Sequence, residues 1–359
     1  MTIHYLNTYH RVILREENKN VLKSQNTLKK IIEVELKTIV VNRQLNLYEM
    51  LRYHLGFQNI SGETCDMSHG KLIRPILCLL CCQATMGDLL KVIPAAVSLE
   101  LIHNFSLIHD DIQDDSHKRR QRPTVWKLWG KEQAINAGDA MFAMSYLELL
   151  KLQDNNISDK KIVRSMRLLT EACLNLCEGQ YLDMLYECTC NITTENYLTM
   201  IMKKTADLIA TCTALGASFG TDNDEIINNF YMFGRDLGMA FQITDDVLGI
   251  WGTEAKTGKP EKIDILKKKK TFPVVYSLNN GSVQDNKELK QYYSNNKTEE
   301  HVVIRIVEIL NSLGAQAYSQ KKAQQYYKLA LSRLETIDIE QSRRTPIINM
   351  VNLLMGRDY

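Results

Sequence analysis

Apolar residues recur three and four positions apart along most of this chain, a spacing that places them on one face of an α-helix. Alternating apolar and polar runs, which would predict β-strands, are scarce. The predicted helices cover residues 28–51, 72–85, 93–108, 134–152, 159–176, 197–215, 225–248, 302–313 and 317–334. The pattern therefore predicts one all-α domain of about ten helices, packed as a large bundle.

Composition narrows the picture further. Apolar residues make up 45% of the 359 positions, enough for a sizeable core. Residues 1–22 are largely polar and are expected to be ordered only in part, ahead of an all-helical domain over residues 23–359. Lys plus Arg number 44 and Asp plus Glu number 42, so the net charge gives no electrostatic reason to expect a nucleic-acid partner.

The chain also carries no clear membrane or secretion signal. We expect no signal peptide and no transmembrane segment, because no stretch approaches 18 consecutive apolar residues. The odd count of nine cysteines favours reduced thiols in a cytoplasmic protein. Cys78, Cys81 and Cys82 could suggest zinc, but no second Cys or His pair stands at zinc-finger spacing.

An acidic cluster follows the apolar run over residues 99–108. It consists of Asp110, Asp111, Asp114 and Asp115. On a helix, residues four apart share a face, and like charges there cost about 0.2–0.5 kcal/mol per pair. A helix that carries two such pairs is expected to meet a cation, and carboxylate oxygens suit Mg²⁺. The alternative is an ordinary solvated acidic face.

A second acidic pair, Asp245 and Asp246, follows another apolar run, and a Lys-rich stretch over residues 267–270 comes after it. Two acidic clusters at the ends of apolar helices, each followed by cations, suggest a symmetric arrangement. Carboxylates on opposing helices could hold several Mg²⁺ ions. Together with lysine and arginine, these ions could grip a diphosphate and stabilise it as it departs.

These motifs resemble those of the trans-isoprenyl diphosphate synthases. Their first motif, DDxxD followed by four intervening residues and then RR, matches Asp110 to Asp114 with Arg119 and Arg120. Their FQxxDD element matches Phe241, Gln242, Asp245 and Asp246. The resemblance covers roughly residues 45–355. It implies Mg²⁺-dependent head-to-tail condensation of isopentenyl diphosphate with an allylic diphosphate, three Mg²⁺ ions per site, and a homodimer.

The resemblance also implies roles for individual residues. Asp110, Asp114 and Asp245 would bind Mg²⁺, with Asp111 and Asp246 as helpers. The allylic diphosphate would be contacted by Arg119, Lys204, Gln242, Lys259 and Lys269, and Thr205 would help to hold the surroundings of the nascent cation. The pair Gln180 and Asp183 would face inward from a neighbouring helix. Isopentenyl diphosphate would bind to Lys71, Arg74, His103 and Arg120.

Product length is expected to depend on Phe105, five residues before Asp110, with the small Ser106 beside it. Five helical residues span about 7.5 Å, so a ring at that depth would close the floor of a tunnel for the growing chain. An aromatic residue here, without an insertion in the first motif, resembles synthases that make geranylgeranyl diphosphate, with farnesyl diphosphate as the next choice. Phe105 could equally be plain core packing.

The chain departs from the family pattern at four positions. Gly249 stands where many relatives have a third aspartate, and Gln121 where a glycine often follows the arginine pair. Leu72 replaces a common arginine, and His69 replaces a common glycine. Two other functions stay open: a class I terpene cyclase, whose usual second motif is absent here, and a non-catalytic subunit, which would typically have lost its acidic motifs.

Overall fold

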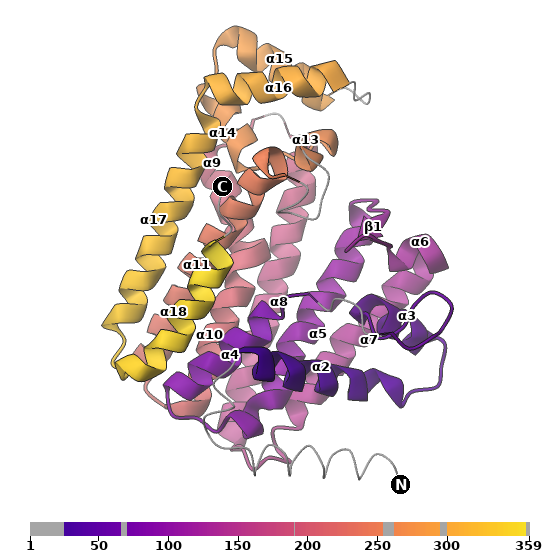
Figure 1. Cartoon of the computed structure of the whole chain (residues 1–359), viewed down its shortest axis with the longest axis vertical. Coiled ribbons are helices and arrows are strands. Elements are labelled where there is room, and N and C mark those ends of the chain that lie inside the picture. The colour runs from indigo at the N-terminus through magenta and orange to yellow at the C-terminus, as the bar shows by residue number, and fades with distance from the viewer. Residues whose placement is uncertain (1–24, 66–69, 190, 254–261, 295–299, 357–359) are drawn as a thin grey trace. The chain divides into compact units, whose positions relative to one another are not determined.

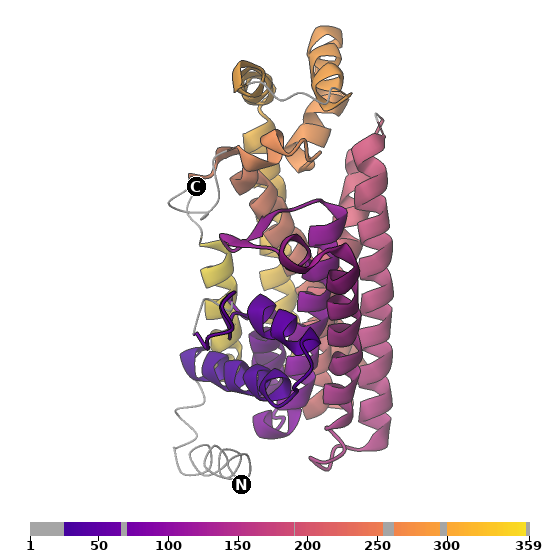
Figure 2. The same ribbon diagram turned by 90° about the vertical axis from the view of Figure 1, so that its right-hand side faces the viewer.

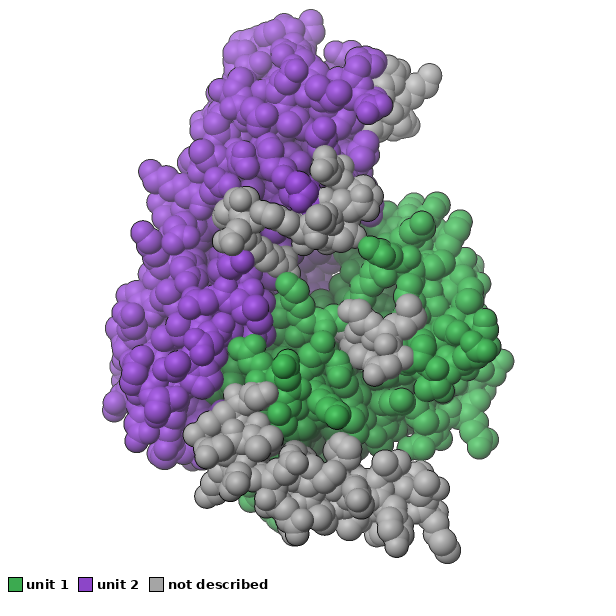
Figure 3. All heavy atoms as spheres, in the orientation of Figure 1, with its two compact units in different colours: residues 1–82, 88–162 green, residues 83–87, 163–359 purple. Residues whose placement is uncertain are grey.

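A computed structural model describes residues 25–65, 70–189, 191–253, 262–294 and 300–356. The polar segment over residues 1–22, Lys259 and His69 therefore lie outside the described residues. The chain divides into two compact units (Figure 3). Unit 1 comprises residues 1–82 and 88–162, and unit 2 comprises residues 83–87 and 163–359. In the described residues, helices dominate both units and the one sheet is a two-stranded hairpin, which confirms the predicted all-α class.

Unit 1 is built around the long helix α5 (Leu89–Gln113), which packs along α7 (Lys131–Leu150). The other elements that begin in this unit are α2 (Gln25–Val41), α3 (Leu47–Leu55), α4 (Ile73–Ala84), β1 (Lys118–Arg119), β2 (Arg122–Pro123), α6 (Val125–Trp129) and α8 (Asp159–Cys188). Within the described part of the chain, α5 alone is long and apolar enough to cross a membrane, but 72% of its apolar window is buried inside the protein. A core helix passes the same test, so α5 is no evidence for a membrane span.

Unit 2 is centred on α11 (Asp224–Trp251), which lies between α10 (Asp207–Gly220) and α17 (Ala315–Thr336) (Figures 1 and 2). The remaining elements are the rest of α8, α9 (Thr194–Ile201), the π-helical turn η2 (Met202–Ala206), α13 (Ile263–Leu266), α14 (Phe272–Asn280), α15 (Val283–Ser294), α16 (Glu300–Ser312) and α18 (Gln341–Met355). Tyr197, Met200 and Ile201 of α9 pack with Phe272 of α14 in one apolar cluster. The same α9 residues form part of the wall of the cavity described below.

Several predicted helix boundaries were wrong. The single helix expected over residues 28–51 is two helices, because an exposed and mainly polar stretch, Asn42 to Asn46, interrupts it. The helix expected over residues 159–176 runs on to Cys188. Helix α18 was missed because Pro346 and a polar first turn hide its periodicity. Helix α14 was missed because it is short and has Pro273 in its first turn, where proline is tolerated.

Candidate active site

The first acidic motif ends α5 and combines one accessible and one buried carboxylate. Asp110 is partly exposed, whereas Asp111 is buried. The Arg119 guanidinium donates from Nε to both carboxylate oxygens of Asp111, at 3.0 and 2.9 Å, and from Nη2 to Asp110 Oδ2 at 3.2 Å. Burial raises the pKa of Asp111 and Arg119 opposes that rise. Arg119 therefore holds the two neighbouring aspartates in a fixed arrangement.

One expectation about this motif was wrong. Asp115 does not share a helical face with Asp111, because α5 ends at Gln113 and Asp115 has a left-handed backbone with φ of 46°. Its carboxylate instead pairs with Lys131 Nζ at 2.7 Å, on the exposed surface. The helix therefore carries one such pair, Asp110 with Asp114, and Asp114 itself forms the C-terminal cap.

A hairpin that the apolar pattern did not reveal presents the arginine pair. In it β1 pairs antiparallel with β2, so that Arg119 lies opposite Arg122. The two connecting residues, Arg120 and Gln121, have φ of 50° and 63°, as in a type I′ turn, which normally contains glycine or asparagine. Arg122 anchors the hairpin to α3: its guanidinium lies 3.9 Å from the centre of the Tyr53 ring and donates to Tyr53 O at 2.8 Å.

Three of the four residues expected to bind isopentenyl diphosphate influence one another within unit 1. Burial lowers the pKa of His103 well below its usual value, and the charges of Arg74 and Arg120 add to the effect. The Arg120 side chain also approaches the segment before α4, because a methyl group built on Gly70 would lie 3.0 Å from Arg120 Nη2. Lys71, next to Gly70, is exposed. The hairpin arginine and the segment before α4 therefore meet.

Two residues that sequence reasoning missed belong to this cationic region. Glu100 of α5 is buried, and burial raises its pKa while the charge of Arg74 opposes the rise. His54 lines a small cavity of about 20 Å³ together with Arg119, Arg120 and Arg122. Burial lowers the pKa of His54 well below its usual value, and the nearby arginines lower it further, so the ring is neutral. No motif marks either residue, since a lone glutamate or histidine on an apolar helix is usually structural.

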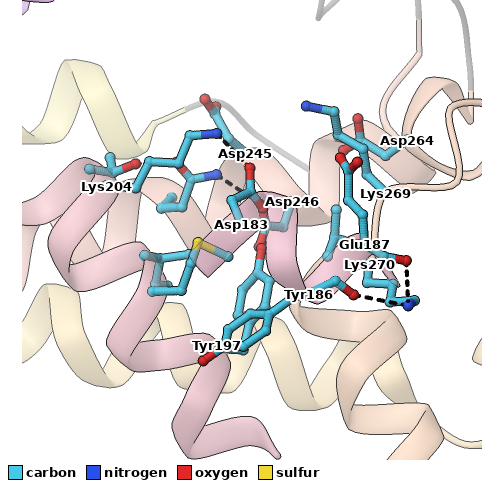
Figure 4. A pocket seen from close by; sticks show the side chains of 15 residues that line it. Asp183, Tyr186, Glu187, Tyr197, Lys204, Asp245, Asp246, Asp264, Lys269 and Lys270 are labelled. Atoms are coloured by element: carbon cyan, nitrogen blue, oxygen red, sulfur yellow. Dashed lines mark hydrogen bonds and ion pairs between the residues drawn. The ribbon is translucent and has the colours of Figure 1, made fainter. Parts of the chain in front are cut away.

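The second acidic motif lies at a larger cavity inside unit 2, with a volume of about 180 Å³ (Figure 4). The expected residues that line it are Asp183, Lys204, Thr205, Gln242, Asp245, Asp246 and Lys269. Asp264 and Tyr197 line it too, although Tyr197 was not foreseen. Acidic and basic side chains from four separate segments thus converge on one hollow, although they lie up to 86 positions apart along the chain, from Asp183 to Lys269.

A π-helical turn places Lys204 and Thr205 at this cavity. The turn η2 interrupts the path from α9 into α10. Two glycines let neighbouring helices approach it: a methyl group on Gly179 of α8 would overlap the backbone of Lys204, and one on Gly238 of α11 would lie 2.5 Å from Ala206 Cα. Such π turns widen a helix locally and often occur at functional sites. The helical periodicity of the sequence gives no signal for it.

Asp246 is the buried member of the second pair and accepts three hydrogen bonds. They come from the Tyr197 hydroxyl at 2.6 Å, Gln242 Nε2 at 2.9 Å and the Phe272 backbone N–H at 3.2 Å. Burial nevertheless raises the pKa of Asp246 to about 7. Gln242 Oε1 in turn accepts from the Thr205 hydroxyl at 2.8 Å. Asp245, in contrast, is only partly buried and lines the cavity.

The lysines of this region divide into two groups. Lys204 Nζ pairs with Asp183 Oδ2 at 2.5 Å, and Lys269 lines the cavity. Lys270 also lines the cavity, but its ammonium group donates to the backbone carbonyls of Tyr186, Glu187 and Thr189 at the C-terminal end of α8. Gln180, expected to face inward, is buried, and its side-chain nitrogen has no hydrogen-bond partner among the described residues.

Phe105 and Ser106 lie one to two turns before the first motif, as expected. The Phe105 ring is 8% exposed and meets the rings of His109 and Phe142 edge-on, at centroid distances of 5.5 and 5.2 Å. Ser106 donates to His103 O at 2.7 Å and is partly buried. Phe142 in turn contacts Tyr146, so aromatic rings continue from α5 along α7.

In each unit of this all-helical fold, a pair of adjacent aspartates lies near lysine or arginine side chains. A family model described as polyprenyl synthetase matches residues 58–310. The chain belongs to the polyprenyl synthetase family, which confirms the family resemblance of the two motifs.

Curated relatives agree with this assignment. The chain is 42% identical over 236 residues to a geranylgeranyl diphosphate synthase from Mycobacterium tuberculosis, a match that spans 66% of each chain. It is 36% identical over 290 residues to a short chain isoprenyl diphosphate synthase from Methanothermobacter thermautotrophicus, which covers 81% of this chain and 87% of the relative. The match to the first relative thus spans just under two thirds of that protein's length.

Solved structures agree as well. The geranylgeranyl pyrophosphate synthetase from Pyrococcus horikoshii superposes with a TM-score of 0.83 at 30% identity, covering 98% of this chain and all of the other. A geranylgeranyl pyrophosphate synthase from Corynebacterium glutamicum, complexed with isoprenyl diphosphate and magnesium, superposes with a TM-score of 0.81 at 25% identity. It covers 93% of this chain and 99% of the other.

Proposed function

We propose that this protein condenses isopentenyl diphosphate head-to-tail with an allylic diphosphate to make a short-chain trans-prenyl diphosphate. The observation that carries the proposal is the unit 2 cavity, where Asp245, Lys204, Gln242 and Lys269 line one hollow. Carboxylates and lysines around one cavity suit a diphosphate held partly through metal ions and partly by direct ionic contact. Membership of the polyprenyl synthetase family supports the same reaction class.

The donor set fits Mg²⁺ as the partner of that diphosphate. Asp245 lines the cavity together with Asp246 and Lys269. Mg²⁺ commonly binds through one or two carboxylates plus substrate phosphates. Asp110, Asp114 and Asp245 would hold three Mg²⁺ ions, which would neutralise charge on the departing diphosphate.

The protein's own residues would then divide the remaining tasks. Arg119 would fix the first acidic motif, and Lys204 and Lys269 would contact the allylic diphosphate directly. Thr205 and Gln242, which are hydrogen-bonded to each other, would present oxygen dipoles toward the carbocation that forms when the diphosphate leaves. We propose that the departed diphosphate takes the proton released at the end.

The second substrate would bind at the cationic region of unit 1. Arg74 and Arg120 lie near a neutral His103, and Lys71 is exposed to solvent. Arginine forks match the oxygens of a diphosphate, so this region can bind isopentenyl diphosphate without metal ions. A terpene cyclase would have no use for such a region, which disfavours the main alternative.

Product length and cell location belong to the same proposal. Phe105 at the expected depth favours geranylgeranyl diphosphate, with farnesyl diphosphate next. Two relatives that carry the name geranylgeranyl diphosphate synthase or synthetase support this order. We further propose a cytoplasmic enzyme.

An assembly of two chains is part of the proposal as well. Helix α8 presents exposed apolar side chains at Leu174, Tyr181, Met184 and Leu185, which recur at intervals of three, four and seven. Such a stripe is suited to packing against the same stripe of a second copy. Sedimentation equilibrium should give the mass of two chains, and Leu174→Asp should shift it toward one.

The reaction is tested by incubating the purified protein with Mg²⁺, isopentenyl diphosphate and each of three primers, namely dimethylallyl, geranyl and farnesyl diphosphate. Elongated prenyl diphosphates, detected by mass spectrometry, support the proposal. A cyclic hydrocarbon would show a terpene cyclase instead. No product with any primer, from a folded protein, would indicate a non-catalytic subunit.

A further inference from the structure

Arg122 joins the β1–β2 hairpin to α3 and to the segment that follows α3. Its guanidinium lies 3.9 Å from the centre of the Tyr53 ring. Its Nη2 donates to Tyr53 O at 2.8 Å and to Gln58 O at 3.3 Å. Tyr53 contacts the hairpin a second time, because its hydroxyl donates to Pro123 O at 2.8 Å. The pair of Arg122 and Tyr53 is called the hairpin clamp below.

The Tyr53 side of the clamp is firmly packed. Tyr53 is 5% exposed, and its ring meets the Trp129 ring edge-on at a centroid distance of 5.2 Å. The ring is thus supported by Trp129 while it also receives the Arg122 guanidinium. A guanidinium over an aromatic face is attracted by the ring quadrupole, and the attraction strengthens where water is excluded. The hairpin is therefore attached to a fixed point of unit 1.

The hairpin needs such an attachment. It consists of only two residue pairs, one of which is Arg119 opposite Arg122. An isolated two-stranded hairpin is marginally stable at best in water. The two connecting residues, Arg120 and Gln121, both have positive φ, which disfavours residues that have a Cβ. Contacts outside the hairpin must therefore hold the turn in this conformation.

The two arginines of the first motif differ in what fixes their side chains. Arg119 is held by two hydrogen bonds from its Nε to the Asp111 carboxylate. The Arg120 side chain makes no hydrogen bond or ion pair within the described part of the chain. Arg119, Arg120 and Arg122 line one small cavity, where the single carboxylate of Asp111 balances only one of three like charges. The position of Arg120 therefore depends on the backbone of the turn, and that backbone depends on the clamp.

We infer that the hairpin clamp positions Arg120 for the diphosphate of isopentenyl diphosphate. The inference rests on the proposed function, since it assigns a task in the binding of the second substrate. Arg122 and Tyr53 are positioning residues: they do not touch the substrate, but they fix the turn from which Arg120 extends. Loss of the clamp should weaken the binding of isopentenyl diphosphate. The affinity for the primer should hardly change, because Arg119 keeps its own anchor.

The test compares Arg122→Gln, Tyr53→Leu, the double variant and the conservative Arg122→Lys. Arg52→Gln is the matched control, because Arg52 also donates to two backbone carbonyls of unit 1, those of Val40 at 3.0 Å and Arg43 at 3.2 Å. The first readout is isothermal titration calorimetry with isopentenyl diphosphate in EDTA, which needs neither metal nor turnover. The second readout is the pair of KM values for isopentenyl diphosphate and for geranyl diphosphate, measured with Mg²⁺.

Arg122→Gln and Tyr53→Leu should each raise the Kd for isopentenyl diphosphate about tenfold, since each removes the cation–π contact of the clamp. The double variant should bind no more than about twofold more weakly than either single variant, because both changes remove the same contact. Arg122→Lys keeps a cation over the ring and should recover part of the affinity. The KM for geranyl diphosphate in these variants, and both KM values in Arg52→Gln, should stay within about twofold of the wild type.

An unchanged Kd in a folded Arg122→Gln protein would overturn the inference. Equal losses for the two substrates, or an equal loss in Arg52→Gln, would overturn it as well, because either result describes a general structural effect. Circular dichroism and thermal unfolding show whether each variant is folded. Should Arg122→Gln fail to fold, Arg122→Lys and Tyr53→Phe, which keeps the ring but removes its hydroxyl, decide the matter.

This outcome is separable from that of the proposed reaction. If the wild type elongates a primer but the clamp variants keep its KM for isopentenyl diphosphate, the inference fails and the prenyl transfer stands. If the wild type binds isopentenyl diphosphate but makes no product, the proposed reaction fails and calorimetry still decides the role of the clamp. A wild type that does not bind isopentenyl diphosphate in EDTA overturns the inference.

Discussion

Replacing Phe105 with alanine should lengthen the products. The Phe105 ring is 8% exposed and lies between His109 and Phe142, five residues before Asp110. Five helical residues place it about 7.5 Å along the axis from the first motif. Removing the ring frees a space of about its own size, which is comparable to one five-carbon unit, so we expect the main product to gain at least one unit.

The measurement is mass spectrometry of the products made from the same primer by both proteins. Loss of a buried phenylalanine ring costs about 3–5 kcal/mol of folding free energy, so thermal unfolding must confirm that the variant is folded. Phe57→Ala, which truncates another buried ring of unit 1 that follows α3 in the sequence, is the matched control and should leave product length unchanged. An unaltered product from a folded Phe105→Ala protein would show that this ring is only core packing.

Three further predictions concern stability. Tyr197→Phe removes a hydrogen bond to the buried Asp246 carboxylate, so the free energy of unfolding in urea should fall by about 1.5–3 kcal/mol, and by less in an Asp246→Asn background. Gln121→Gly should raise the melting temperature, because a backbone φ of 63° strains a residue that has a Cβ. Gln121→Val should lower the melting temperature, and the opposite order of the two variants would refute the strain. Burial and nearby arginines lower the pKa of His54 and His103, so below about pH 6.5 the unfolded chain binds more protons than the folded one. Carboxyl groups whose pKa burial raises, such as Asp246, act in the opposite sense, so the histidine contribution is measured as the difference from a variant that carries His54→Gln and His103→Gln. As the pH drops from about 6.5 to 5, the wild type should lose free energy of unfolding relative to that variant, and an equal pH dependence of the two proteins in urea titrations would contradict two neutral buried rings.

The sequence indicated the charged side chains that gather at each site better than it indicated the residues that pack beside them. Side chains that face a substrate have restricted types, so aspartate pairs with following lysines and arginines stand out against an apolar helix. Tyr197 and Glu100 do not stand out, because a tyrosine or a glutamate within a helix is usual. Their importance comes from packing beside Asp246 and Arg74, which are 49 and 26 positions away. Neighbours that are this far apart in the sequence cannot be identified from a local pattern.

The fold was predicted where periodicity is strong and long. Helices such as α5, α7 and α11 bury a continuous face and were found near their actual positions. The π turn at Lys204 was not predicted, because helical periodicity gives no signal for it. The helices that carry Gly179 and Gly238 approach this turn closely, and such contacts between distant segments cannot be read from local sequence. The hairpin was also missed, since its turn uses Arg120 and Gln121 where glycine or asparagine would have signalled it.

In both acidic motifs the two adjacent aspartates differ in exposure and in hydrogen bonding, which their sequences do not reveal. In each, the first aspartate is partly exposed, whereas the second is buried and held by the protein itself. Arg119 holds Asp111, and Tyr197 with Gln242 holds Asp246. A carboxylate whose hydrogen bonds are already supplied by protein donors is a poor competitor for a metal ion, but it fixes the helix end beside it. The accessible partner, Asp110 or Asp245, is then kept in place without being saturated. The two adjacent aspartates of each motif therefore differ in their surroundings: one is held by protein donors, and the other is left accessible.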